Sequence, residues 1–428
     1  MRTSSFGVSG EPLSPSQRWL CFASIFFLAF LAAFNLFKAA PAIQYIASDL
    51  SMPQTMVSQI MGVYSIAALV MAFPGMWFAQ KMGFKFSALI AGVSMIVGSA
   101  ICAIATTTPV FFAGRIIEGI GYGLVAVIGP NSVPRLLSAE KMGLAMGIWG
   151  QWLPVGTLGS FFVAPIAFNA AGGTQVAFSW QAIWWLAITV EAVGIIWLLA
   201  CFKLPEVGEN DRALSASAKA GQSRSDFMGS AIVACFSFMV VTYLYVGNYN
   251  TFYPTFLQNY RDMSVEVSSL FPTLAAAAAV VGGIFLGTMA AKRNVRKPMI
   301  IAGHLCLVAL FAFCLYTPGD DLAGPLIGTV VMGVVAGTVP ACTYSILPVL
   351  AATPKKSDFA LAALSFFTAS GKVLAGALVS PSLVAIGYFA NAQLICAPLA
   401  LIAAVVVWVF MKSDKKVSEL RLQEQKSN

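Results

Sequence analysis

Five charged residues lie well inside long apolar runs of this 428-residue chain: Lys38, Arg115, Glu118, Glu191 and Lys372. A charge in the middle of a membrane-spanning helix costs about 2.5–3.5 kcal/mol on insertion scales. The five together would cost on the order of 12–17 kcal/mol unless partners or a water-filled cavity offset the cost. Residues that are this unfavourable to bury are the first candidates for chemistry.

Arg115 and Glu118 are three residues apart, so they share one face of a helix, and Tyr122 continues that face at the next turn. One interpretation is that the pair lines a cavity, where Glu118 gains and loses a proton. The other is a structural ion pair that neutralises itself. The sequence leaves both open.

The two lysines differ in their depth within an apolar run. Lys38 lies near the end of its run, on the same face as Asn35, so it either extends to the membrane interface or meets a ligand. Lys372 lies about 13 residues from either end of its run, and no acid is within helical reach. It must lose its proton or meet an anion, and we favour an anion.

The remaining candidates have weaker signals. Glu191 is predicted to be a structural or protonated carboxyl, and His304 is predicted to be structural because no second ligand lies near it for a metal site. Aromatic pairs at helical spacing are typical of packing and less often of cavity walls. They are Trp149 with Trp152 and Tyr245 with Tyr249. No nucleotide-binding, zinc-protease or nucleophile motif is present in the sequence. We therefore expect that the chain is not an enzyme and binds no cofactor.

The composition places these residues in a membrane protein. The chain is 59% hydrophobic and 10% charged, with a mean hydropathy of +0.82, whereas soluble proteins are about a quarter charged. A cytosolic enzyme, a disordered protein and a secreted disulfide scaffold are therefore excluded. The eight cysteines lie within apolar runs without clustering, and we expect small buried hydrophobic residues.

Twelve apolar runs are long enough to cross a bilayer as helices, which need about 20 residues. They are 19–41, 56–79, 84–106, 109–133, 142–166, 180–202, 228–254, 265–290, 298–316, 322–346, 359–384 and 387–411. We predict an all-α membrane protein with an N-terminal six-helix bundle (1–202), a linker (203–227), a C-terminal six-helix bundle (228–411) and a basic tail (412–428).

The distribution of Lys and Arg predicts the orientation. With both termini inside, the inner segments hold 21 of the 25 Lys and Arg residues, and the outer loops hold one, Arg261. Cytoplasmic loops carry such an excess of cations. The same pattern explains the net charge of +8 without a nucleic-acid partner. The basic tail is predicted to meet anionic lipid.

The two halves repeat. Asn35 and Asn248 lie at an offset of 213 residues, as do Pro41 and Pro254, in the first run of each half. The fourth runs repeat at an offset of 214 through Gly119 with Gly333, Gly123 with Gly337, Pro134 with Pro348 and Lys141 with Lys355. These glycines form small-xxx-small faces, for which packing is the main interpretation. The first span of each half starts on the same side of the membrane, so the repeat is parallel. Such a repeat predicts two bundles related by an axis along the membrane normal.

Twelve helices in two such halves resemble the major facilitator superfamily. The segment Pro74–Gly83 is similar to the family's G-x-L-a-D-r-x-G loop, with Met76 at the first Gly and Gln80 at the Asp. Residues 115–121 are similar to its R-x-x-Q-G-x-G pattern, with Glu118 at the Gln. Together with Gly147–Trp149 and Trp152–Gly156, these segments most resemble the prokaryotic cyanate-permease-type group. The resemblance implies a gating loop, for which Gln80, Lys81 and Gly83 are the candidates.

These observations predict a secondary transporter of a small anion, with an organic anion favoured. It is expected to work by alternating access in the cell membrane, with protons as a candidate coupling ion. The candidate substrate-binding residues are Lys372, Lys38, Asn35, Arg115, Asn248, Tyr249 and Trp152, and Glu118 is the candidate proton-coupling residue. A drug or metabolite exporter of the same fold is one alternative, and a non-transporting membrane sensor is another.

Overall fold

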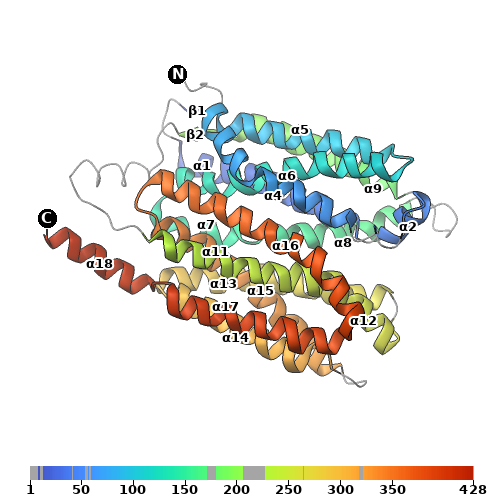
Figure 1. The fold of residues 1–428 in the computed structure, drawn as a ribbon. Helices are drawn as coiled ribbons and strands as arrows, with labels where there is room; N and C mark the ends of the chain where they lie inside the picture. The colour runs from blue at the N-terminus through green and yellow to red at the C-terminus, as the bar shows by residue number, and fades with distance from the viewer. Residues whose placement is uncertain are drawn as a thin grey trace. The chain divides into compact units, whose positions relative to one another are not determined.

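The computed structural model is almost entirely helical (Figure 1). It describes residues 8–9, 13–40, 42–53, 56, 59–170, 180–205, 227–263, 265–317 and 322–427. Within these residues, eleven helices are long and apolar enough to cross a membrane. Each of the twelve predicted runs falls mainly on helical residues, and the run 142–166 is divided between two helices. Pro41 and residues 206–226 of the predicted linker lie outside the described residues.

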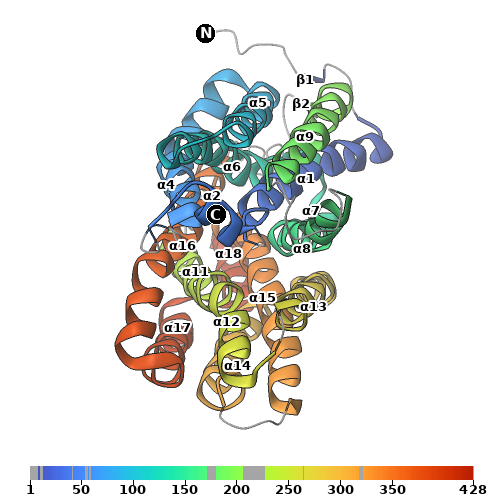
Figure 2. The same cartoon turned by 90° about the vertical axis from the view of Figure 1, so that its right-hand side faces the viewer.

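The first of two compact units comprises Met1–Leu136 and Val155–Gly208. Its elements are β1 (Val8–Ser9), α1 (Pro15–Phe37), α2 (Ile43–Asp49), α4 (Gln59–Met82), α5 (Phe84–Ala103), α6 (Thr108–Leu136), most of α8 (Trp152–Ala170), α9 (Gln181–Cys201) and β2 (Leu204–Pro205). The two short strands pair in parallel, which the sequence did not predict. In the view along the helices, α1 lies beside α6 and α9 (Figure 2).

The second unit comprises Leu137–Pro154 and Glu209–Asn428. Its helices are α7 (Ala139–Trp149), the start of α8, α11 (Met228–Thr242), α12 (Asn250–Arg261), α13 (Val265–Lys292), α14 (Arg296–Ala309), α15 (Ala323–Leu350), α16 (Pro354–Asn391), α17 (Ala397–Phe410) and α18 (Asp414–Ser427). Three π-helical turns join them: η1 (Tyr243–Tyr249), η2 (Leu310–Cys314) and η3 (Ala392–Cys396). Because residues 137–154 group with this unit, the units divide the chain differently from the predicted bundles, whose boundaries stay predictions.

Local sequence signals explain how the first helix begins. Ser14 precedes α1, and its hydroxyl accepts the amide N–H of Gln17, while the Gln17 side chain accepts the amide N–H of Ser14. This reciprocal cap satisfies two amide groups that would otherwise lack partners at the start of a helix. Pro15 then occupies the first helical position, where its missing N–H costs nothing.

Glycines set the close helix pairs in each unit. A Cβ at Gly119 or Gly123 would collide with α4, and one at Gly333 or Gly337 would collide with backbone oxygens of α13. The packing interpretation of the small-xxx-small faces is therefore confirmed. Because the contacts are made to backbone atoms, no side chain can move aside to admit a larger residue.

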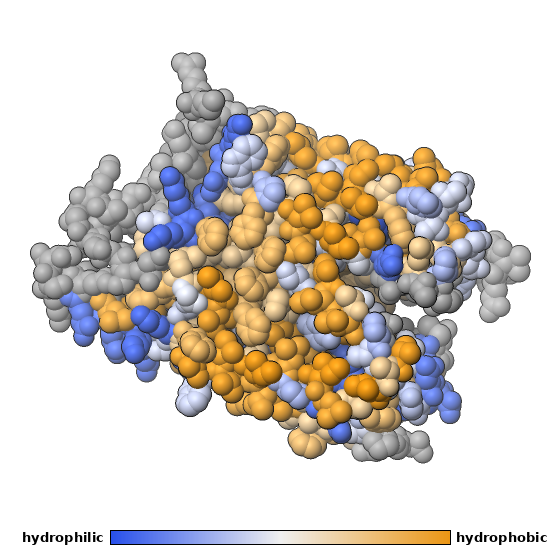
Figure 3. Space-filling view, viewed as in Figure 1, coloured by the Kyte–Doolittle hydropathy of each residue, from blue (hydrophilic) through white to orange (hydrophobic). Residues whose placement is uncertain are grey.

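Large apolar side chains are exposed on the helices of both units, such as Val70 and Ile196 in the first and Phe285 and Trp408 in the second. Apolar surface covers much of the face in Figure 3, as expected for helices in lipid. All eight cysteines are free. The expectation that all are buried is wrong for Cys306, which is exposed on α14, and for Cys201 and Cys314, which are partly exposed.

The predicted basic tail forms α18, and polar contacts within the second unit anchor its start. Asp414 forms a buried ion pair with Arg296, the first residue of α14, and also accepts the Arg296 amide N–H. Lys297 donates to the carbonyl oxygens of Trp408 and Met411, which lie at the end of α17. These contacts satisfy helix-end groups that have no partner inside their own helix.

Candidate functional site

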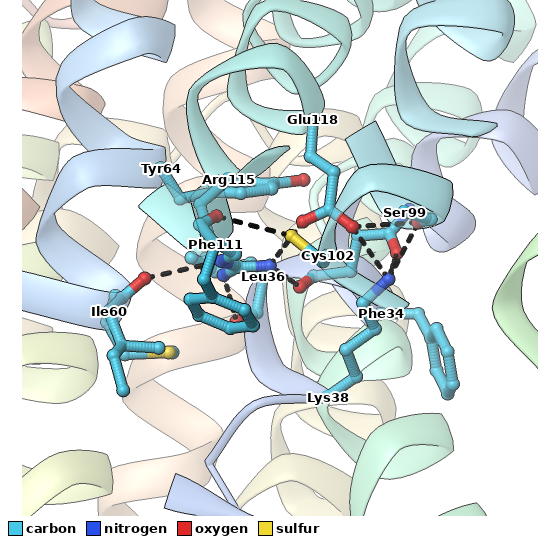
Figure 4. Close-up of polar contacts among 12 residues, drawn as sticks. Phe34, Leu36, Lys38, Ile60, Tyr64, Ser99, Cys102, Phe111, Arg115 and Glu118 are labelled. Atoms are coloured by element: carbon cyan, nitrogen blue, oxygen red, sulfur yellow. Dashed lines mark hydrogen bonds and ion pairs between the residues drawn. The ribbon is translucent and has the colours of Figure 1, made fainter. Parts of the chain in front are cut away.

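The first unit contains a fully buried cluster of charged side chains around Glu118 on α6 (Figure 4). Arg115 Nη1 lies 2.6 Å from Glu118 Oε2, as the spacing of the two residues predicts. Lys38 Nζ lies 2.8 Å from Glu118 Oε1, and the hydroxyl of Ser99 on α5 donates to the same oxygen at 2.7 Å. One carboxylate therefore accepts from three side chains.

Arg115 also ties together the ends of two helices. Its guanidinium donates to the carbonyl oxygens of Asn35 and Leu36 in α1 and of Ile60 in α4, at 2.8, 3.2 and 3.3 Å. The guanidinium also stacks 4.5 Å from the ring centroid of Tyr64. These carbonyls are available because they lie near helix ends or beside a close crossing. The guanidinium of Arg115 is a planar fork of donors, which suits several acceptors at once.

Lys38 turns inward instead of extending to the membrane interface. It follows the last residue of α1, where its N–H still donates to the Phe34 carbonyl. Its ammonium donates to Asn35 Oδ1, to Ser99 Oγ at 2.8 Å and to Glu118, so all three of its protons are used. The side chain is fully buried. The interface interpretation of Lys38 is therefore wrong, because acceptors on three helices surround the ammonium.

Glu191 on α9 joins this cluster through Asn35. The Asn35 amide accepts from Lys38 through Oδ1 and donates to Glu191 Oε1 through Nδ2. The other carboxyl oxygen, Oε2, has no hydrogen-bond partner among the described residues, and the side chain is 1% exposed. Residue spacing could not predict this contact, because Asn35 and Glu191 are 156 residues apart. The only available signal was the charge inside an apolar run.

The second unit has an uncharged cluster at the equivalent asparagine. Asn248 donates to Asn391 Oδ1 at 2.9 Å and accepts from the Tyr316 hydroxyl at 2.8 Å. The hydroxyls of Tyr249 and Thr329 lie 2.8 Å apart. Asn248 and Tyr249 belong to the π-helical turn η1, and such turns occur frequently at functional sites.

Lys372 lies on α16, where that helix passes closely beside η1 and α11. The side chain is 6% exposed. A Cβ at Gly247 would collide with Ala375, and a Cβ at Gly371 would meet the Met239 carbonyl oxygen. Small residues on either side of Lys372 therefore bring α16 against the helix that carries Asn248.

The other predicted site residues have different contacts. Trp152 stacks on Trp149 with ring centroids 6.4 Å apart, and both are buried at the break between α7 and α8. Lys81 lies exposed over the ring of Trp77, beside the exposed Gln80. Gly83 ends the loop with φ of 92°, a conformation that favours glycine. The gating role of this loop stays a prediction.

The single histidine, His304, lies on α14 with its Nε2 atom 2.7 Å from the Ser237 hydroxyl. Within the part of the chain that the structure describes, no group of three or more His, Cys, Asp or Glu side chains could hold a metal ion.

Comparison with known proteins gives the family. Residues 25–375 match the family model described as Major Facilitator Superfamily. The MFS-type efflux pump MMF1 of Mycosarcoma maydis is 25% identical over 218 residues, which cover 50% of this chain and 32% of that protein. The efflux pump FUS6 of Gibberella fujikuroi is 26% identical over 225 residues, covering 52% and 38%. The alignments thus span about a third of the length of these curated relatives.

Two solved structures share the fold at low sequence identity. The proton:xylose symporter XylE bound to 6-bromo-6-deoxy-D-glucose superimposes with a TM-score of 0.76 and 14% identity, covering 95% of this chain and 100% of that one. The human organic anion transporter MFSD10 superimposes with a TM-score of 0.72 and 15% identity, covering 92% and 100%. At such identity these likenesses show the fold alone.

Proposed function

The chain belongs to the major facilitator superfamily, and on that premise we propose that it moves a small organic anion across a membrane together with protons. Members of this family are membrane transporters, and the proposal specifies what this chain transports. We further propose the cell membrane as its location, with both termini in the cytoplasm, because the inner segments hold most of the cations.

The buried cluster around Glu118 is the observation that supports proton coupling. Two cations and two carboxyls lie buried together, on α6, on α9 and at the residue that follows α1. Ionisable residues within membrane spans commonly form proton relays. A change of protonation in this cluster alters contacts on several helices at once, which is what coupling requires.

Lys372 is the residue that supports an anionic substrate. Its positive charge is nearly buried in the middle of α16, and the spans of the second unit carry no carboxylate between residues 359 and 411 or between 267 and 316. The ammonium of Lys38 belongs to the buried cluster of the first unit, where it donates to Asn35, Ser99 and Glu118. We therefore assign the anion to Lys372 and regard Lys38 as part of the buried cluster.

The test is anion binding by the purified protein. Thermal unfolding is measured with oxalate, malate, nitrate and phosphate, because a ligand that binds the folded state raises its apparent stability. For the anion that binds, Lys372→Ala should weaken affinity at least about 30-fold, since truncating a desolvated charge partner costs about 2–5 kcal/mol. Lys355→Ala removes an exposed lysine of the same helix and serves as the matched control.

Two outcomes would count against the anion proposal: wild-type affinity in Lys372→Ala, or stabilisation by none of the anions.

The second candidate function is export of a largely apolar compound, and the names of the efflux-pump relatives favour it. Aromatic stacking in the second unit, such as Tyr249 on Tyr253 at 4.8 Å, would suit such a substrate.

A further inference from the structure

We infer that Glu191 is the acid that takes up and releases the coupled proton, while Glu118 stays ionised between Lys38 and Arg115. This inference rests on the proposed proton coupling and specifies which carboxyl performs it. The sequence favoured Glu118 because it forms the evident pair with Arg115. The surroundings of the two carboxyls differ, and this difference assigns them separate tasks.

Glu118 is held in its ionised form by its neighbours. Its two oxygens accept from the guanidinium of Arg115, the ammonium of Lys38 and the hydroxyl of Ser99. Protonation would remove the negative charge between two fully buried cations and would turn an acceptor into a donor beside an ammonium and a guanidinium, which only donate. Breaking a buried ion pair from one side is strongly unfavourable, so Glu118 is a fixed anion.

Glu191 has weaker support for its ionised form than Glu118 has. The neutral amide of Asn35 donates to its Oε1, whereas its Oε2 has no hydrogen-bond partner among the described residues. An ionised carboxylate with a bare, buried oxygen is poorly solvated. A neutral carboxyl, however, leaves Lys38 and Arg115 with the charge of Glu118 alone to balance them. These opposing costs make Glu191 the carboxyl that can change state.

The charged and titratable groups of the cluster around Glu191 come from four parts of the unit. They are Lys38 after α1, Tyr64 on α4, Cys102 on α5, and Arg115 and Glu118 on α6. With Glu191 protonated, these groups and Glu191 sum to a charge of +1, and with Glu191 ionised they sum to zero. In the step itself, the Glu191 O–H bond breaks, its proton passes to water, and the electron pair stays on the carboxylate.

Asn35 carries the effect of this step to the rest of the cluster. Its amide lies between Glu191 and Lys38, and its backbone carbonyl accepts from Arg115. Ionised Glu191 binds the amide N–H more strongly than neutral Glu191 does. Loss of the proton from Glu191 on α9 therefore strengthens the hydrogen bond that links α9 to Asn35 on α1. Because Glu191 is closed to solvent here, exchange of the proton requires another conformation of the unit.

Infrared spectroscopy tests the assignment without a substrate. Protonated carboxyls have a carbonyl stretch separate from that of carboxylates, and exposed acids are ionised between about pH 6 and 8. In lipid-reconstituted wild-type protein we expect a carbonyl band that decreases across this range. Glu191→Gln should abolish the titrating band. Glu118→Gln should retain it, and so should Glu140→Gln, which changes an exposed acid on α7.

A titrating band that survives in Glu191→Gln, or that is absent from the wild type, would overturn the inference. Glu191→Asp guards against a misfolded variant, because it keeps the acid and moves it away from Asn35. It should retain the band with a shifted midpoint, and an unshifted midpoint also contradicts the assignment. The spectra do not depend on transport. A wild-type protein that shows no pH-driven uptake would refute the proposed function, whereas the spectra alone decide whether Glu191 is the carboxyl that titrates.

Discussion

Asn35 and Asn248 show how two copies of one residue acquired different surroundings. They lie 213 residues apart in the sequence. Asn35 donates to Glu191 on α9, and Asn248 donates to Asn391, the last residue of α16. Near Asn35 lie Lys38, Arg115 and Glu118. At the same offsets of 213 and 214 residues, the second half has Thr251, Thr329 and Met332. The charges thus belong to one copy, although the asparagine belongs to both.

The charged cluster could be predicted only in part from the sequence. Helical spacing placed Arg115 beside Glu118, because contacts three residues apart follow from helix geometry. The contacts of Lys38 with Ser99 and of Asn35 with Glu191 join different helices, 61 and 156 residues apart. Such contacts depend on how helices pack, and residue spacing carries no information about them.

A double substitution should reveal the buried ion pair. Glu118→Gln leaves Lys38 and Arg115 as buried cations without their anion, and should lower the free energy of unfolding by about 3–5 kcal/mol. Adding Lys38→Met removes one of these cations, so the double variant should be more stable than Glu118→Gln alone. The measurement is thermal unfolding in detergent, with the exposed Lys81→Met as the control. Additive losses in the double variant would mean that the two side chains are not coupled.

The break between α7 and α8 is the clearest difference between predicted and observed elements. The run 142–166 is apolar throughout and predicts one continuous helix. In the structure, α7 ends at Trp149 and α8 begins at Trp152. A Cβ at Gly150 would approach the backbone of Ala341 to 3.1 Å, so the close crossing with α15 requires a small residue here. Hydropathy finds spans but is insensitive to such crossings, which depend on residues distant in sequence.

Close helix crossings should respond to added volume in a position-specific way. Gly337→Ala puts a methyl group against the carbonyl oxygen of Ala279 and should destabilise the protein by about 1–3 kcal/mol. Gly376→Ala, on α16, meets nothing within 4 Å and should be neutral or stabilising by up to about 1 kcal/mol, because alanine favours helix. Unfolding of both variants in detergent decides the matter. Equal effects would show that α13 and α15 do not cross as closely as described.

At the scale of the whole chain, the two halves carry different kinds of polar group. The first unit holds the cluster with two carboxyls, whereas Lys372 is the charge in the middle of a span of the second. Under the proposed function, substitutions at Glu191 should change proton coupling, and substitutions at Lys372 should change affinity for the anion. The composition predicted a multi-pass membrane protein, because it reflects the surroundings of every helix. It could not predict this division, which depends on a few residues.

The orientation of the chain in the membrane gives the last prediction. Lys219 belongs to the predicted cytoplasmic linker and lies outside the described residues, whereas Thr106 lies exposed between α5 and α6, in a predicted outer loop. A membrane-impermeant thiol reagent added to intact cells should label Thr106→Cys and leave Lys219→Cys unlabelled until the cells are opened. The parent protein is the control for its native cysteines, of which Cys306 is exposed. Because 21 of the 25 Lys and Arg residues would face the cytoplasm in this orientation, labelling of Lys219→Cys from outside would contradict the positive-inside argument for the whole chain.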